Sequence, residues 1–80
     1  MKLPRNLSAS ELIKALNKYH YSVERQKGSH IRLTTTVKGQ HHITIPNHDP
    51  LKIGTLSAIL GDIANYLGKT KEEVIQELFS

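Results

Sequence analysis

Apolar residues recur at helical spacing near the start of the chain and then change to strict alternation. Over residues 8–19 they fall on one face of a helix, at Ala9, Leu12, Ile13, Leu16 and Tyr19. Ser8 and Glu11 have the Ser-x-x-Glu spacing of a capping box, in which each side chain accepts a hydrogen bond from the other residue's backbone N–H. The pattern predicts a first helix over residues 8–19.

Residues 20–46 alternate between apolar and polar positions, as half-buried strands do. The apolar positions are the pairs Tyr21 and Val23, Ile31 and Leu33, and Ile43 and Ile45. The pattern predicts three strands that share one polar face. That face is expected to carry Ser22, Glu24, Gln26, His30, Arg32, Thr34, His42 and Thr44.

Matching the faces of the second and third strands fixes how they pair, because residues directly opposite in an antiparallel pair point to the same side. A three-residue loop over 37–39 places Leu33 opposite Ile43. The last residue of this loop, Gly39, suits the left-handed position that such loops contain.

The same argument predicts a three-residue loop over 27–29 between the first two strands. It places Val23 opposite Leu33 and Glu24 opposite Arg32. Arg32 is then paired with a carboxylate and is less free to bind an anion, so Lys27 ranks above it as a ligand-facing cation.

After the strands, residues 46–54 are a turn-rich connection with two prolines. Helical spacing returns over residues 55–67, with Thr55 as the expected N-cap and Gly68 as the end of the helix. A second capping box, residues 70–73, opens a short third helix. The order α-β-β-β-α-α predicts an α+β fold, a two-layer sandwich with a three-stranded antiparallel sheet, and 80 residues predict one domain over 1–80.

Charge is concentrated in the first part of the chain. Residues 1–52 contain nine Lys or Arg and three acidic residues, a net charge of +6, whereas residues 53–80 have a net charge of −2. A basic surface favours a polyanion such as nucleic acid, although it also occurs as an ordinary solvated surface. Cysteine is absent and no apolar run approaches the roughly 18 residues of a membrane span, so a cytoplasmic location is expected.

His30 is the candidate catalytic residue, because an imidazole takes up and releases protons near neutral pH. Residues that can hold a phosphate surround it in the sequence, namely Arg25, Lys27, Gly28, Ser29 and Arg32. Arg25 is two residues from Val23, so in a regular strand both side chains point to the same face, and Arg25 is expected at the edge of the sheet. The alternative is that His30 is an ordinary polar residue after a hairpin turn.

The other histidines suggest a weaker possibility, a metal site. His41 and His42 are adjacent on a strand and therefore point to opposite faces, so they do not share one ion. His30, His42 and His48 together with Asp49 have the ligand types of a zinc or nickel site, but no tight ligand spacing supports one. His42 and His48 are also candidates for a second proton-transfer group.

Over nearly its whole length the chain resembles the HicA, or YcfA-like, family of small toxins. The similar stretches are the helix SASELIKALNKYHYSV, the run RQKGSHIRL with its Gly-Ser-His signature, the strand end IPNH, and GTLSAIL at the second helix. The family often has Gly near the end of the first helix, where this chain has His20.

The resemblance implies a fold like a double-stranded-RNA-binding domain and the activity of an mRNA interferase. Such a toxin is an endoribonuclease that needs no metal or other cofactor, cleaves mRNA and arrests translation. The family's catalytic histidine maps onto His30, and the residues before it map onto Gly28 and Ser29. Expected RNA contacts are Arg25, Lys27, Gly28, Ser29, Arg32 and His42.

The resemblance also implies a partner, a HicB-type antitoxin that covers the active face in a type II toxin–antitoxin pair, with a higher-order complex as a further expectation. Two other functions fit the same fold. One is a non-catalytic RNA-binding module that uses Lys38, Lys52 and Lys69 at helix ends and loops. The other is a metal-binding or protein-interaction domain.

Overall fold

The structure is a computed structural model that describes residues 3–79. Its first helix, α1, spans Ala9–Leu16 and continues as one 3₁₀ turn, η1, over Asn17–Tyr19. The predicted capping box is present, since the Ser8 Oγ accepts from the Glu11 N–H at 3.1 Å and Glu11 Oε1 accepts from the Ser8 N–H at 2.9 Å. These hydrogen bonds, the backbone one first, lower the pKa of Glu11.

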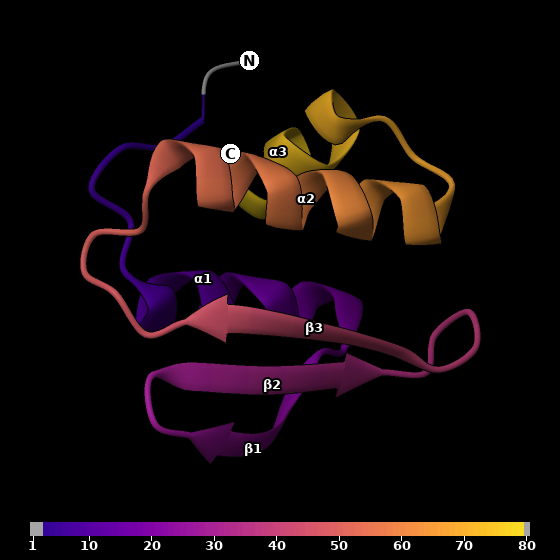
Figure 1. The fold of residues 1–80 in the computed structure, drawn as a ribbon. Coiled ribbons are helices and arrows are strands. Elements are labelled where there is room, and N and C mark those ends of the chain that lie inside the picture. Colours follow the sequence, from indigo (N-terminus) through magenta and orange to yellow (C-terminus); the bar gives the residue numbers. More distant parts are fainter. Residues whose placement is uncertain (1–2, 80) are drawn as a thin grey trace.

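Three antiparallel strands form one sheet in the order β1-β2-β3 (Figure 1). They span Ser22–Lys27, His30–Thr35 and His41–Pro46. Between β2 and β3 the predicted register is confirmed, with Leu33 opposite Ile43. The ladder ends at Thr35 and His41, so the connection covers residues 36–40 rather than 37–39 alone, and Gly39 has φ +89°.

The predicted register between β1 and β2 is wrong at the turn. Gly28 and Ser29 alone form the connection, so Lys27 lies opposite His30. Val23 still lies opposite Leu33, because the strand has one extra residue, Glu24, in a bulge. The shorter turn therefore moves the residues of β1 by one position relative to β2. The extra residue in the bulge restores the predicted pairing at Val23.

The bulge changes which side chains β1 presents. Arg25, and not Glu24, lies opposite Arg32, and Gln26 lies opposite Ile31 on the helix side of the sheet. β1 is also exposed along its whole length, with Val23 52% exposed, which corrects the expectation of a half-buried strand. It is one of the two edge strands of the sheet, and all six of its residues are exposed.

Helix α2 spans Ile53–Leu67 and α3 spans Lys71–Phe79. Helix α2 begins before residue 55, so Thr55 is not its N-cap; Lys52 holds that position without a side-chain cap. Gly68 ends α2 with φ +70°, as predicted. The second capping box is confirmed by hydrogen bonds between Thr70 and Glu73.

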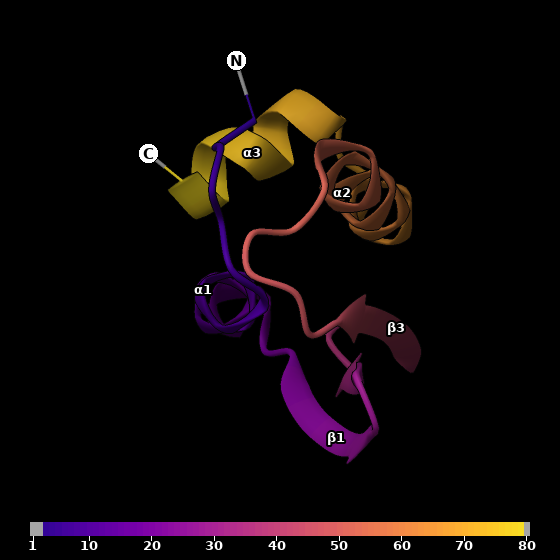
Figure 2. The same ribbon diagram turned by 60° about the vertical axis from the view of Figure 1, so that its left-hand side comes forward.

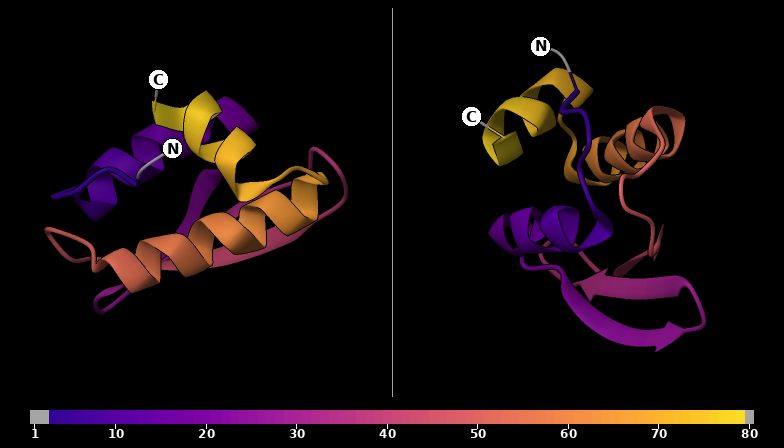
Figure 3. Two further views of the ribbon diagram at one scale, coloured as in Figure 1. Left: turned by 90° about the horizontal axis from the view of Figure 1, so that it is seen from above. Right: turned by 90° about the vertical axis from the view of Figure 1, so that its left-hand side faces the viewer.

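All three helices lie on one side of the sheet and leave the other face open (Figures 2 and 3). The core between the helices and the sheet contains most of the side chains that the helical and alternating patterns predicted to be buried, with Val23 as an exception. The largest fully buried residues are Leu12, Leu16, Tyr21, Leu33, Ile45, Leu56, Leu60, Ile63 and Val74. The order α-β-β-β-α-α and the α+β class are confirmed. Among residues 3–79 no helix is long and apolar enough to cross a membrane.

Candidate functional site

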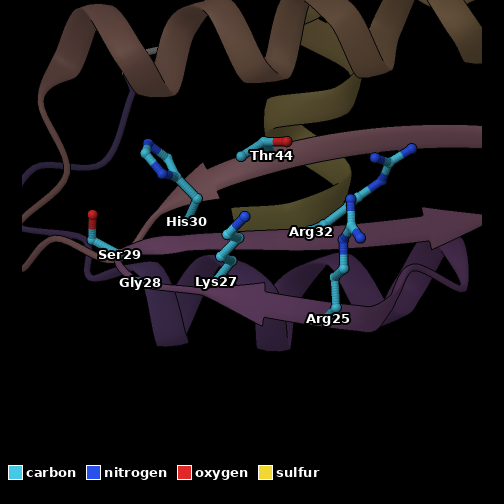
Figure 4. Close-up of a pocket in the computed structure, with 7 residues that line it drawn as sticks. All are labelled: Arg25, Lys27, Gly28, Ser29, His30, Arg32 and Thr44. Atoms are coloured by element: carbon cyan, nitrogen blue, oxygen red, sulfur yellow. The ribbon is translucent and has the colours of Figure 1, made fainter.

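An open pocket of about 530 Å³ lies on the sheet face that the helices leave free (Figure 4). Its volume falls in the range of about 300–1,000 Å³ typical of ligand sites. Its lining consists of Arg25, Lys27, Gly28, Ser29, His30, Arg32 and Thr44. Six of these seven are residues that the sequence singled out; Thr44 was expected only on the polar face.

The turn between β1 and β2 forms one end of the pocket. Gly28 has φ +60°, whereas Ser29 is not in the left-handed region. A positive φ at only the first central residue is the pattern of a type II′ hairpin turn, which favours Gly there. The Asn47 N–H donates to the Ser29 carbonyl at 2.6 Å and ties the turn to the segment after β3. This contact joins distant parts of the chain, so no local pattern predicts it.

His30 is the first residue of β2 and its side chain is exposed on the open face. Figure 4 shows His30 and Lys27 on the same side of the sheet, with Lys27 between His30 and the two arginines in this view. The imidazole is the one lining side chain that ordinarily titrates near neutral pH. The pocket thus places an imidazole, a group able to take up and release protons, beside fixed positive charge.

Arg25 reaches this pocket only because of the bulge. Without the extra residue, strict alternation from Val23 would turn Arg25 toward the helices. Bulges next to binding sites commonly redirect a side chain in this way. Arg25 does lie on an edge strand, as expected. The expectation that it shares the side of Val23 is wrong, because the bulge turns it into the pocket.

Glu24, from the bulge, lies within ion-pair distance of two side chains on the open face. Its Oε1 is 3.5 Å from Arg32 Nε and 3.0 Å from His42 Nδ1. Both nitrogen atoms are inaccessible to solvent, and neither contact meets hydrogen-bond geometry. The ion pair between Glu24 and Arg32 is thus present although the two residues are not directly opposite.

His42 and His48 do not line the pocket. His42 lies opposite Thr34, four residues along β2 from His30, which corresponds to about 13 Å. His48 lies in the connection after β3, where its backbone N–H donates to the Pro46 carbonyl. Among residues 3–79 no group of three or more His, Cys, Asp or Glu side chains is arranged to hold a metal ion.

His41 points to the helix side and belongs to a second cluster, which the sequence did not reveal. Its ring stacks on Tyr66 at 4.3 Å, its Nδ1 is 2.7 Å from the Tyr21 hydroxyl, and its Nε2 is 3.4 Å from Asp62 Oδ1. Burial, followed by Tyr66 and Asp62, raises the pKa of Tyr21. The Tyr21 hydroxyl therefore stays protonated, and its hydrogen bond with Nδ1 takes its direction from the tautomer of His41. Together with the stacking on Tyr66, the cluster fastens β3 to α2.

The lysines named for a groove-binding RNA module are mostly engaged elsewhere. Lys38 Nζ donates to the Leu67 carbonyl at 3.1 Å, and Lys69 Nζ is 2.7 Å from Glu77 Oε2. Lys52 remains exposed. These contacts leave the pocket on the open face as the better-formed cationic surface.

Comparison with known proteins identifies one family. The family model described as the HicA toxin of bacterial toxin–antitoxin matches residues 9–64, which is well over half of the chain. The matched range includes α1, the whole sheet and the pocket. No curated protein and no solved structure matches the chain.

Proposed function

The chain belongs to the HicA toxin family of bacterial toxin–antitoxin systems, and from this premise we propose that it is an endoribonuclease that cleaves mRNA. The observation that carries the proposal is the pocket itself, in which the exposed His30 lies among three cationic side chains on one open face. RNA cleavage needs a proton-transfer group and positive charge at one phosphate, and the pocket offers both.

The proposed reaction is attack by a ribose 2′-hydroxyl on the adjacent phosphorus. His30 takes the proton from the hydroxyl as the new oxygen–phosphorus bond forms. The bond from phosphorus to the 5′-oxygen breaks and water protonates the leaving oxygen. The hydroxide that forms takes the proton back from His30, which returns to its starting state. The products are a 2′,3′-cyclic phosphate and a 5′-hydroxyl, so atoms and charge balance without a metal ion.

The remaining lining residues hold the substrate in this proposal. Lys27 binds the reacting phosphate and stabilises its developing charge. Gly28 lets the backbone approach closely, and the Ser29 hydroxyl donates a hydrogen bond. Arg25 and Arg32 contact the RNA backbone, and His42 contacts it beyond the pocket.

A direct test uses the purified chain, a single-stranded RNA oligonucleotide and excess chelator. We expect fragments ending in a cyclic phosphate. The same oligonucleotide with deoxyribose at the cleaved position should stay intact, because it lacks the attacking hydroxyl. RNA that is retarded on a gel but uncut would instead support the non-catalytic RNA-binding module.

The family also implies a partner. We propose that a HicB-type antitoxin covers the pocket in the cytoplasm, where the toxin would meet mRNA. An antitoxin mixed with the toxin before RNA is added should abolish RNA binding. A stable complex that still binds RNA as the free toxin does would contradict this part of the proposal.

A further inference from the structure

Arg25 and Arg32 lie directly opposite each other on β1 and β2. Like charges in this position repel each other, so the pair is unfavourable unless an anion lies near it. Glu24 supplies one negative charge, at 3.5 Å from Arg32 Nε. Arg25 has no hydrogen-bond or ion-pair partner among the described residues. The two arginines together therefore have more positive charge than the protein itself neutralises.

Glu24 fits its position poorly. A single oxygen, Oε1, approaches both Arg32 Nε and His42 Nδ1, and neither contact has hydrogen-bond geometry. The Glu24 side chain is 42% exposed, so its carboxylate is already partly hydrated and loses little when it leaves this contact for water. A phosphate presents several oxygens and matches the planar fork of a guanidinium, so it is the better anion for this place.

The arginine pair is also placed where RNA would supply a phosphate. Both arginines line the same pocket as His30. Arg25 is two residues from Lys27 on β1, which corresponds to about 7 Å along the strand. That separation is close to the one between successive phosphates of a nucleic-acid strand, so two neighbouring phosphates fit one at Lys27 and one at Arg25.

We propose that Arg25 and Arg32 form a second phosphate subsite, one nucleotide from the phosphate at His30, and that Glu24 occupies it until RNA displaces the carboxylate. The inference rests on the proposed RNA substrate and adds to it the position of the neighbouring phosphate and an internal competitor. Glu24 is then a residue that weakens RNA binding, although it lies beside the site.

Binding of a 2′-O-methyl RNA oligonucleotide tests the subsite without any cleavage step, since this RNA lacks a free 2′-hydroxyl. Fluorescence anisotropy compares the wild type with Glu24→Gln and with Glu72→Gln, which removes the same charge on α3. We expect Glu24→Gln to bind about two- to five-fold tighter, the range of a lost surface ion pair, and Glu72→Gln to change affinity less.

The increase in affinity from Glu24→Gln must also depend on Arg32 and on the charge of the neighbouring phosphate. In an Arg32→Gln background, Glu24→Gln should give no more than the Glu72→Gln effect. A methylphosphonate, which is uncharged, in place of the neighbouring phosphate should remove the gain as well. Weaker binding by Glu24→Gln, an effect equal to that of Glu72→Gln, or a gain that persists without Arg32 would overturn the proposal.

The subsite and the nuclease activity fail separately. If ordinary RNA is cut but Glu24→Gln gives no gain, the subsite is wrong and the proposed function stands. If the gain appears but ordinary RNA stays intact under all conditions, the subsite stands on an RNA-binding protein and the proposed cleavage is wrong.

Discussion

Gly28 and His20 are two of the described residues whose backbone lies in the left-handed region. Gly28, in the turn before His30, has φ +60°, and His20, after the first helix, has φ +64°. Glycine adopts this conformation freely, whereas a residue with a Cβ pays about 1–2 kcal/mol. The HicA-like resemblance places Gly near position 20, and the geometry explains that preference.

His20→Gly should therefore stabilise the protein. Relief of the left-handed strain exceeds the entropy that glycine adds to the unfolded chain, and we expect a net gain of about 0.5–1 kcal/mol in the free energy of unfolding by urea denaturation. His48→Gly is the matched control, because His48 is exposed and has no positive φ. It should destabilise slightly, and equal gains from both changes would refute the conformational account.

At the scale of elements, the hairpin of β1 and β2 determines the site. A regular alternation with matched faces predicted a three-residue loop, which was the simplest way to place Val23 opposite Leu33. The chain instead combines a two-residue Gly28-Ser29 turn with a bulge at Glu24. Gly-Ser is itself a signal for a two-residue turn, and such a turn requires one extra residue in β1 to match the faces.

Gly28→Ala and Gly54→Ala separate backbone conformation from crowding. An added Cβ meets nothing within 4 Å at either position, but only Gly28 has a positive φ, while Gly54 lies in α2. We expect Gly28→Ala to destabilise by about 1–2 kcal/mol and Gly54→Ala to stabilise by about 0.5 kcal/mol, measured by urea denaturation. Two effects of the same sign would contradict the assigned turn.

Glu77 ties α3 to η1 and to the connection before α3, because it accepts from the Tyr19 hydroxyl at 2.5 Å and from Lys69 Nζ at 2.7 Å. The bond from Lys69, then that from Tyr19, lowers the pKa of Glu77 below its ordinary value of 4.5. Because the folded-state pKa is the lower one, the stabilisation is complete above pH 4.5 and is lost as the pH falls through the folded-state pKa.

Glu77→Gln should accordingly lower the urea midpoint at pH 7 and have a much smaller effect once the pH is low enough to protonate Glu77 in the folded protein. Glu72→Gln, on the same helix, serves as the control, because Glu72 has no hydrogen-bond or ion-pair partner among residues 3–79. A difference between wild type and Glu77→Gln that stays constant from neutral to acidic pH would contradict the assigned contacts.

For the whole molecule, the uneven charge of the sequence becomes a difference between surfaces. The basic first part of the chain supplies the sheet and its open face, whereas four of the seven acidic residues lie in α2 and α3. Helical and alternating patterns predicted the order of elements, the second hairpin and most of the pocket. They missed the Asn47 contact and the His41 cluster, because these depend on residues brought together only by the fold. They missed the bulge because alternation alone does not contain the signal of the Gly-Ser turn.

Proton transfer by His30 is the central claim, and the rate of a single turnover with RNA tests it most directly. His30→Gln keeps a polar side chain but cannot shuttle a proton, so we expect the cleavage rate at saturating enzyme to fall by about 10²–10⁴-fold, while His48→Gln cleaves as the wild type does. Cleavage by His30→Gln at the wild-type rate, with the same products, would contradict the account.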